Sequence, residues 1–514
     1  MRLLSCFIRK LAAPLIFASF CHLPAFAQNM DATSVTVSPY RHNAVKRSLA
    51  ESLGDRVSVK DFGARGNGQT DDTQAVQAAI YAVCDPPGGS APWGSGGAIF
   101  FPPGVYSISS VKFPCNGVSL IGANNGNTNS GSLDWRGTVF KLTTQDRQTA
   151  FAVGMTTADY GGGIHVSHAS IDGSMMAPTA TVFDFSWLQH SSIEDISARD
   201  IPNFYREEGG AANSLTDITI MNLSGTGIEF FGDASQCQGP HLASCNKRAD
   251  LLRVTRVNMN GTDNHTATCF SYHDFAQSLN VDHAICENAR YGIGAYCSAA
   301  QGHNGEACPA FARFHDFEAE NCTYCVDASD IQDWEFSNGY FLGEGKNSPH
   351  VIRFVNQNYA APASKTDAGT YAEAVRFHGG RIGNSGRSAI YIGISDFIIE
   401  GGQVFSSNLS DTTGQTGAPN IEIAGTESIT MPTRGLIYGN ILCEASGQQP
   451  LYNPNIPASS GTNKTDAAPP ALVQGSIWLN LGVTNVKVFG NETSRCSSSP
   501  QDFNKSGNNV IGPF

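Results

Sequence analysis

The sequence predicts an all-β protein built as a single parallel β-helix, and three observations lead to this expectation. First, Val281–Ile293 and Phe314–Val326, 33 residues apart, share the pattern Glu-Asn-x-x-Tyr followed by a small and a β-branched residue. Second, a looser copy of the same unit spans Arg376–Ile390. Third, the apolar segments in each unit are only three to five residues long, which is strand length and too short for helices. Repetition of short strands at such a period is typical of a solenoid.

One asparagine recurs in each unit and predicts one sharp corner per coil, because Asn tolerates a left-handed backbone better than other residues with a side chain. The recurring residues are Asn203, Asn222, Asn260, Asn288, Asn321, Asn338, Asn384, Asn408, Asn440 and Asn491. A β-sandwich is the alternative fold. Its hairpins would favour Asn-Gly or Asp-Gly turns, and the chain has few of them.

The N-terminal 27 residues have the pattern of a secretory signal. Basic residues precede an apolar core over Leu11–Phe20, and Ala25-Phe26-Ala27 forms a small-x-small cleavage site. A membrane anchor is the rival interpretation, but the apolar run is short for a span. We therefore expect a secreted or periplasmic protein, cleaved near Ala27 and free of the membrane afterwards.

Charge and cysteine content narrow the partners and the compartment. The net charge is −13, and it becomes more negative when residues 1–27 are lost, because they carry three positive charges. A surface of this charge argues against nucleic acid as a partner. Twelve of the 14 cysteines remain after cleavage, an even number that predicts disulfides. Plausible pairs are Cys84 with Cys115, Cys237 with Cys245, and Cys297 with Cys308, although sequence does not determine connectivity. Cys322-x-x-Cys325 has the spacing of a redox or zinc site, but the repeat places both at structural positions.

The expected elements follow in chain order. Residues 28–56 form a lead-in with a short helix over Ala44–Leu53, and residues 57–110 form a cap with the first strands. In the cap, Thr70 or Asp71 begins a helix, and Gly97–Ile108 reads as strand, turn and strand. The apolar face of that helix consists of Ala75, Val76, Ala79, Ile80 and Val83. Residues 111–496 form the β-helix, interrupted by a polar loop at 457–470, and residues 497–514 form a C-terminal tail.

The cap segment carries a recognisable motif. Val59–Ala64, Gly66–Gly68, Thr70–Thr73 and the Phe101–Tyr106 turn resemble the N-terminal motif of the pectate lyase superfamily, in its rhamnogalacturonase- or epimerase-like group, which includes many phage tailspikes. The close match covers about 50 residues. This resemblance implies a right-handed parallel β-helix that acts on polysaccharide, whereas the motif itself belongs to the cap and is poor evidence of activity. Tailspike relatives imply a trimer, but no coiled-coil segment supports one, and the oligomeric state stays open.

Stacking of strands about 4.8 Å apart predicts rows of equivalent side chains on the outside of the coils. The first row contains Asp282, His315 and His378, with Asp316 beside it. We expect these residues to be catalytic, with Asp282 and His315 in hydrogen-bond reach as a general acid/base pair. The rival interpretation is that such carboxylates and histidines only keep the wall of a solenoid soluble.

A second row contains Arg290-Tyr291, Thr323-Tyr324 and Arg387-Ser388. Tyr324 is a candidate catalytic group for β-elimination at a uronic acid, and Arg290, Tyr291 and Arg387 are candidates for binding sugar. A third row follows the first apolar residue of each strand and adds substrate-binding candidates. Its members are Asp184, Glu229, Ser271, Gly294, Asp327, Arg353, Tyr391 and Glu422, of which Asp327, Arg353 and Tyr391 are the substrate-binding candidates. Tyrosines at strand starts often serve packing alone, which is the alternative for the second row.

The resemblance also bears on the reaction. Related polygalacturonases carry Asn-x-Asp, Asp-Asp and Gly-His-Gly on successive coils, and Asn280-Val281-Asp282 matches only the first of these. No metal ligand set or certain cofactor is recognisable, although acidic coil exteriors are of the kind that bind Ca²⁺. The sequence therefore predicts an exported enzyme that cleaves an extended, uronic-acid-containing glycan, with a lyase preferred over a glycoside hydrolase. The alternative is a non-catalytic glycan-binding scaffold or adhesin on the same fold.

Overall fold

The computed structural model describes the chain with gaps. The described residues are 33–37, 45–49, 57–84, 96–125, 137–153, 161–232, 249–297, 308–357, 374–405, 407, 409, 418–428, 432–444, 474–494, 496, 500–502 and 507–512. The signal peptide, Cys237, Cys245, Asn408 and the loop at 457–470 lie outside them. The chain divides into two compact units, residues 1–56 and 57–514.

The described part of the first unit is a two-stranded antiparallel ribbon of β1 (Thr36–Val37) and β2 (Arg47–Ser48). Thr36 pairs with Ser48, and the amide of Leu49 donates to the carbonyl of Val35 at 2.6 Å. The expected helix over Ala44–Leu53 is therefore wrong at Arg47–Ser48, where pairing with a β-branched partner strand outweighs helical propensity.

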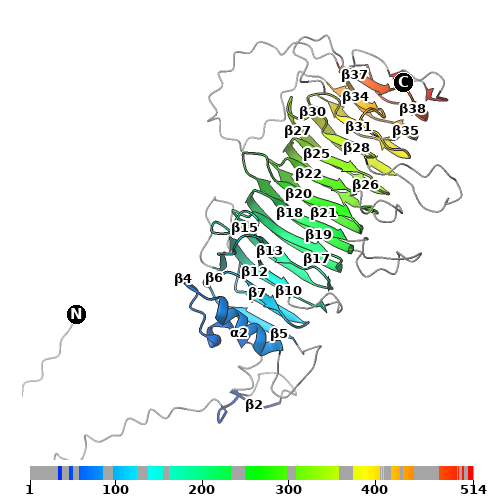
Figure 1. The fold of residues 1–514 in the computed structure, drawn as a ribbon. Helices are drawn as coiled ribbons and strands as arrows, with labels where there is room; N and C mark the ends of the chain where they lie inside the picture. Colours follow the sequence, from blue (N-terminus) through cyan, green and yellow to red (C-terminus); the bar gives the residue numbers. More distant parts are fainter. Residues whose placement is uncertain are drawn as a thin grey trace, which may run out of the picture. The chain divides into compact units, whose positions relative to one another are not determined.

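The second unit begins with the cap. A single 3-10 turn, η1 (Val59–Phe62), leads through β4 (Asn67–Asp71) into helix α2 (Thr73–Cys84). The Asp71 carboxylate accepts a hydrogen bond from the amide of Thr73 at 2.9 Å, which satisfies one free donor of the first turn. The apolar face of α2 is buried as expected, and the helix lies at the N-terminal end of the coils beside β5 and β7 (Figure 1).

The rest of the second unit is a right-handed parallel β-helix, because every pairing between its strands is parallel and each strand pairs with its equivalent in the next coil. A sheet of 25 strands, called the wide sheet, forms two faces of each coil, and a sheet of 13 strands, called the narrow sheet, forms the third. The narrow-sheet strands are β7 (Val111–Phe113), β10 (Thr149–Val153), β13 (Thr181–Asp184), β16 (Asn203–Glu208), β18 (Thr226–Gly232), β20 (Thr268–Asp274), β22 (Tyr291–Tyr296), β25 (Tyr324–Ser329), β28 (Ile352–Val355), β31 (Ile390–Ile392), β34 (Ala418–Ile423), β37 (Gln474–Leu479) and β39 (Gln501–Asp502).

The wide-sheet strands alternate with these along the chain. They are β3 (Val57–Ser58), β4, β5 (Gly97–Phe101), β6 (Gly104–Ile108), β8 (Val118–Gly122), β9 (Thr138–Leu142), β11 (Gly161–Gly162), β12 (His165–Asp172), β14 (Leu188–Gln189), β15 (Ser192–Arg199), β17 (Ala211–Leu223), β19 (Ala249–Gly261), β21 (Ala276–Glu287), β23 (Arg313–His315), β24 (Glu318–Cys322), β26 (Trp334–Ser337), β27 (Tyr340–Gly345), β29 (Val375–His378), β30 (Arg381–Ser385), β32 (Phe397–Glu400), β33 (Gln403–Phe405), β35 (Thr433–Tyr438), β36 (Ile441–Glu444), β38 (Thr484–Phe489) and β40 (Val510–Ile511). The expected strand, turn and strand over Gly97–Ile108 is confirmed as β5 and β6.

Left-handed residues make the corners. Of the recurring asparagines within the described residues, Asn222, Asn288, Asn321, Asn338 and Asn384 have positive φ as expected. The expectation is wrong for Asn203, Asn260, Asn440 and Asn491, whose side chains instead bond to neighbouring coils. The bend inside the wide sheet forms a row of left-handed residues, called the corner ladder. It consists of His168, Asp195, Asp217, Arg256, His283, Asp316 and Asn338 on successive coils.

The interior is apolar and stacked. Phe314, Phe336 and Phe377 occupy equivalent positions in successive coils, with ring centroids 4.8 Å apart and rings nearly parallel. The disulfides Cys84–Cys115 and Cys297–Cys308 are confirmed. Two further disulfides were not anticipated, Cys269–Cys286 between the two sheets and Cys443–Cys496. Cys322 and Cys325 are buried free thiols.

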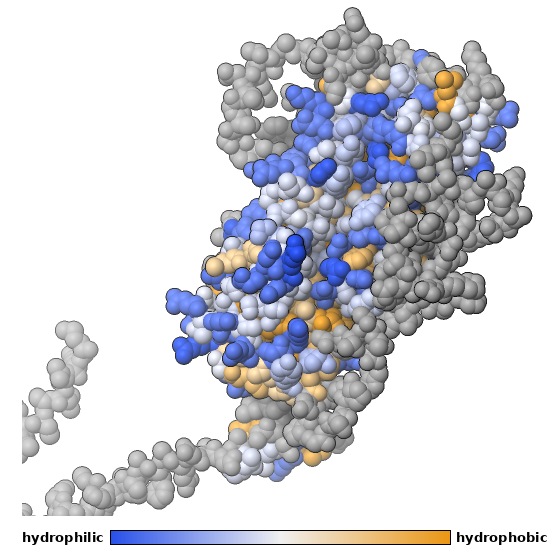
Figure 2. All heavy atoms as spheres, viewed as in Figure 1, coloured by the Kyte–Doolittle hydropathy of each residue, from blue (hydrophilic) through white to orange (hydrophobic). Residues whose placement is uncertain are grey.

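The described surface on the face seen in Figure 2 is largely hydrophilic, in keeping with a net charge of −13. None of the helices in the described residues has the length and apolarity needed to cross a membrane.

Candidate functional site

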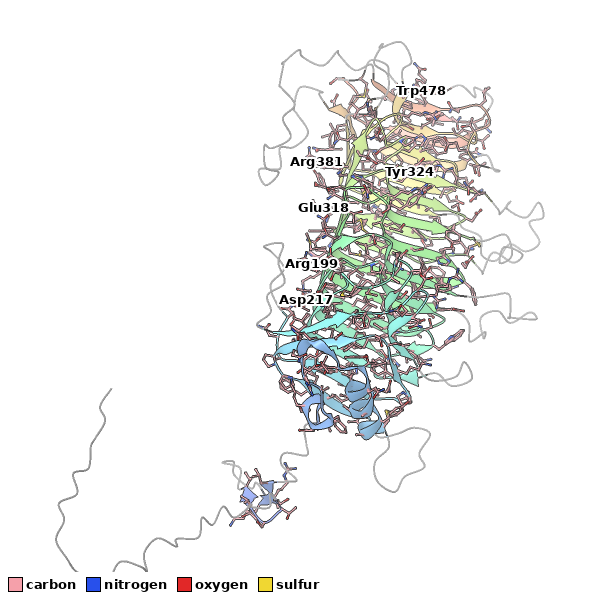
Figure 3. All side chains as sticks on the ribbon, turned by 60° about the vertical axis from the view of Figure 1, so that its left-hand side comes forward. Arg199, Asp217, Glu318, Tyr324, Arg381 and Trp478 are labelled. Atoms are coloured by element: carbon pink, nitrogen blue, oxygen red, sulfur yellow. A yellow bond between two sulfur atoms is a disulfide. The ribbon has the colours of Figure 1, made fainter. Side chains whose placement is uncertain are left out.

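The predicted site residues lie on two different sheets. Asp282, His315 and His378 are in strands of the wide sheet, whereas Tyr324 and Asp327 are in the narrow sheet. Figure 3 shows Glu318 and Arg381 of the wide sheet along one side of the coils and Tyr324 on another. The first row and the other two rows therefore lie on different faces of the coil and form no common groove. The physical reason is the left-handed corner at Asn288 and Asn321, which turns each coil from the wide sheet onto the narrow one.

The wide-sheet row has the expected register, since Asp282 pairs with His315 and both His315 and His378 pair with Ser337. The contacts differ from expectation. Asp282 lies 2.8 Å from Nδ1 of His283, whose Nε2 is 3.1 Å from Asp316. Asp316 also lies 3.3 Å from Nε2 of His315, so its carboxylate contacts the imidazoles of both His283 and His315.

These wide-sheet groups are exposed. The side chains of His283 and His315 are 57% and 49% accessible, so their ion pairs are screened by water and contribute little to stability. His378 lies in the same row, paired with Glu400. The arrangement is a chain of acids and imidazoles on an exposed face of the coils.

The narrow sheet, by contrast, is hollowed. Its outward row has the expected register, in which Glu229, Ser271, Gly294, Asp327 and Arg353 occupy equivalent positions in successive coils. Because Ser271 and Gly294 are small, they leave a depression between larger neighbours. It is a cavity of 330 Å³, within the range of small-molecule sites. Its lining consists of Thr268, Ser271, Tyr291, Gly294, Ala295, Tyr296, Asp327, Ser329, Arg353 and Gln357.

Tyr291 is an aromatic side chain of the cavity lining, and Tyr324 stacks on it from the next coil. Tyr291 pairs with Tyr324, and the two rings stack with centroids 5.9 Å apart and an interplanar angle of 18°. The guanidinium of Arg290 lies 5.0 Å from the centre of the Tyr291 ring. Burial raises the pKa of Tyr324, and the nearby Asp327 carboxylate adds to this effect, so the residue is a phenol at neutral pH.

A charged group closes one end. Arg353 donates from Nη1 to Asp327 and from Nε to Glu427, each at 2.8 Å. Burial raises the pKa of Asp327 although Arg353 opposes the shift. Hydrogen bonds with His350 and Arg353 lower the pKa of Glu427 to about 2. Asp327 is thus a desolvated carboxylate of enhanced basicity beside a fixed cation.

The remaining predicted residues have different surroundings. Arg387 is exposed, with a side chain that is 57% accessible and lies 3.6 Å from Glu427. Tyr391 is fully buried, and its hydroxyl is bonded to Thr426 and to the amide of Glu427. The expectation that Tyr391 binds substrate is therefore wrong, because the turn at Ala424–Ser428 covers it.

Sequence reasoning missed Tyr296, Gln357 and Glu427. Tyr296 stands two residues after Gly294 and so points to the same side of its strand, a signal that the row could have supplied. Glu427 comes from a turn 74 residues from Arg353, and no local pattern links the two. Within the described residues, no group of three or more His, Cys, Asp or Glu side chains is arranged to hold a metal ion.

Comparison with known proteins relates this geometry to other chains. Residues 56–260 match the family model described as "Rhamnogalacturonase A/epimerase, pectate lyase-like". Alginate lyase 7 of Azotobacter vinelandii is 38% identical over 124 residues, 23% of this chain and 12% of that protein. Mannuronan C5-epimerase AlgE3 of the same organism is 27% identical over 254 residues, 46% of this chain and 12% of that protein. The chain thus spans about an eighth of the length of these relatives.

Among solved structures, the tailspike protein of Escherichia coli bacteriophage HK620, in complex with a pentasaccharide, superposes with a TM-score of 0.53 at 10% identity. The superposition covers 92% of this chain and 82% of that one. At this identity the likeness concerns the fold alone.

Proposed function

Because the chain has the right-handed parallel β-helix fold of pectate lyase-like proteins, we propose that it cleaves an extended, uronic-acid-containing polysaccharide by β-elimination. The observation that carries the proposal is the narrow-sheet cavity, whose lining combines Tyr291, a carboxylate of raised pKa and an arginine, with Tyr324 stacked on Tyr291. The names of the relatives, an alginate lyase and mannuronan epimerases, support a uronan as the substrate class.

The proposed substrate lies along the coils, against the stacked rings of Tyr291 and Tyr324. Aromatic rings pack against the apolar faces of sugars, and the exposed guanidiniums of Arg290 and Arg387 stand on the same side of the cavity to meet carboxylates. The two arginines are three coils apart, or about 14 Å at the usual strand spacing. A polymer with repeated negative charges fits that spacing better than a short neutral sugar does.

The proposed reaction uses the residues at the charged end. Asp327 removes the proton α to the sugar carboxylate, and the released electron pair forms a carbon–carbon double bond. The bond to the glycosidic oxygen breaks, and the phenol of Tyr324 donates its proton to that oxygen. Arg353 holds Asp327 in position and, with Arg290, stabilises the charge that develops on the sugar carboxylate.

The test is a digest of alginate, mannuronan, polygalacturonate and a neutral β-glucan by the purified mature chain. Ultraviolet absorbance from unsaturated ends is the expected result on at least one uronan. New reducing ends without that absorbance would assign a hydrolase, and an altered uronic-acid composition without cleavage would assign an epimerase.

One observation favours a second candidate, a non-catalytic glycan-binding scaffold. Arg353 already contacts two carboxylates, so its charge is largely neutralised before any substrate arrives. A scaffold would bind oligosaccharide in the same cavity and leave every polymer of the panel intact.

We also propose that the protein is exported. Four disulfides within the described residues support an oxidising compartment. N-terminal sequencing of the protein from a periplasmic or culture fraction should find a chain that starts just after Ala27, and a mature chain beginning at Met1 would contradict export by this signal.

A further inference from the structure

A column of stacked rings runs along the end of the narrow-sheet strands opposite the end that carries Tyr291. Phe231, His273 and Tyr296 occupy equivalent positions in three successive narrow-sheet strands. Their ring centroids are 4.7 and 4.6 Å apart, and the interplanar angles are 14° and 5°. The rings therefore repeat at the spacing of the strands that carry them.

The middle ring of the column is held in place. The His273 side chain is 8% accessible, with Nδ1 2.9 Å from Asp274 and Nε2 3.3 Å from Glu229. These two carboxylates raise the pKa of His273 although burial opposes the shift. Since both ring nitrogens are engaged and both faces are stacked, the imidazole cannot rotate freely, and it fixes the plane of Tyr296 in turn.

The column ends at Tyr296, because the next coil carries no aromatic residue at the equivalent position. Ala295 pairs with Ala328, so the position that follows Tyr296 in the row belongs to Ser329. Serine is too small to continue the stack, and within the described residues the outer face of Tyr296 has no aromatic neighbour. Tyr296 is 46% accessible, and both residues line the 330 Å³ cavity together with Asp327 and Gln357.

We propose that the space above Ser329 is a sugar subsite, in which the apolar face of one pyranose ring stacks on Tyr296 and takes the fourth position of the column. This inference rests on the proposed function and adds where one sugar sits. A ring there lies beside Asp327 and Gln357, which offer acceptors and a donor to its hydroxyls. The platform is rigid before binding, so little conformational entropy is lost when a sugar arrives.

The test compares four variants in binding of a mannuronate oligosaccharide, with a cello-oligosaccharide as the neutral probe, by titration calorimetry. Tyr296→Ala should raise Kd about 10-fold, whereas Tyr296→Phe, which keeps the ring, should bind as the native chain does. Ser329→Phe should fill the subsite and weaken binding at least as strongly. Tyr81→Ala is the matched control, because Tyr81 is an exposed tyrosine on α2, away from the cavity.

Thermal melts identify any variant that fails to fold, and the two Tyr296 variants decide the matter if Ser329→Phe is one of them. Unchanged binding by Tyr296→Ala, together with turnover lost in Asp327→Asn, would overturn the subsite and leave the proposed function standing. Binding of neither probe and cleavage of no polymer by the native chain would overturn both.

Discussion

Asp327 combines two opposing influences in one side chain. Burial disfavours its charge, and the guanidinium of Arg353 at 2.8 Å favours it, yet the net effect raises its pKa. A carboxylate in that balance is a stronger base than an exposed one, while the arginine keeps it oriented. The pKa of the neighbouring Glu427 is instead lowered, to about 2, because its carboxylate accepts hydrogen bonds from His350 and Arg353.

We expect Asp327→Asn to lower kcat by at least about 100-fold on the polymer that the native chain cleaves, because the amide cannot accept the proton. The pH profile of kcat/KM provides a second readout. Since the base must be deprotonated, the acid limb should lie above the ordinary range of an aspartate. Activity that persists in Asp327→Asn, or an acid limb below pH 4, would assign the base elsewhere.

Glu207 gives a prediction on stability. It is fully buried, accepts hydrogen bonds from Tyr205 and Asn213, and burial raises its pKa to about 8. Between pH 4.5 and about 8 the native state therefore holds a proton that the unfolded state has lost. This stabilisation is complete at the acid end of that window and is lost as pH rises through it.

Glu207→Gln should remove that dependence, because glutamine stays neutral throughout. Urea denaturation at pH 5 and pH 8.5 measures the free energy of unfolding of both chains. Relative to the native chain, the variant should be more stable at pH 8.5 than at pH 5 by a few kcal/mol, because only the native chain loses the contribution of the protonated Glu207. An equal difference between the two chains at both pH values would contradict a protonated Glu207.

Corners are the elements that define each coil, and their chemistry varies with their place. The bend between the sheets is made by asparagines such as Asn288 and Asn321, and their side chains bond to each other at 2.7 Å. The bend inside the wide sheet uses charged residues, and Asp217 binds Arg256 on the next coil through two hydrogen bonds. A left-handed backbone selects for Asn, Asp and His, and stacking then selects for a partner of suitable charge.

Asn321, with φ of 53°, tests the corner. Asn321→Ala should destabilise the protein by about 1–2 kcal/mol, since alanine strains a left-handed backbone. Asn321→Gly restores the backbone freedom and should lose only the side-chain bonds to Asn288 and His265. A chemical denaturation series of both variants separates the two contributions, and equal losses would attribute the effect to the side-chain bonds alone.

At the scale of the whole molecule, much of the fold could be predicted. The duplicated unit at Val281–Ile293 and Phe314–Val326 is two coils, and the cap motif is η1 with α2. The outward row was also predictable, because Asp327 and Arg353 follow the same apolar position and meet at 2.8 Å. Strand periodicity is a local property of the sequence, and aligning the repeats also predicts which residues of neighbouring strands are paired.

Other features were beyond sequence reasoning. Periodicity assigns residues to rows but not to faces, so it does not show that the His315 row and the Tyr324 row lie on different sheets. Likewise, Tyr391 occupies the predicted row, yet a turn from a later coil buries it. Both cases depend on contacts between segments distant in sequence, which no local pattern encodes.

The cap gives a prediction at this scale. Ile80 lies on the buried face of α2 and is fully buried, whereas the adjacent Tyr81 is 53% accessible. Ile80→Asp places an unpaired charge in that contact, so the helix should detach and leave the first coil open to pairing with other chains. Light scattering should show association of Ile80→Asp, with Tyr81→Asp staying as the native chain. A monodisperse Ile80→Asp would mean that α2 is not what protects the end.

The regular stacking of coils has a consequence for the proposed cleavage of an extended polysaccharide. Each coil touches only its neighbours, and the cavity occupies a few adjacent coils of the narrow sheet. Duplicating one whole repeat, such as the unit that contains β24 and β25, would lengthen the sugar path by a single strand spacing. The lengths of the oligosaccharides released should then change by a fixed increment for each repeat that is added.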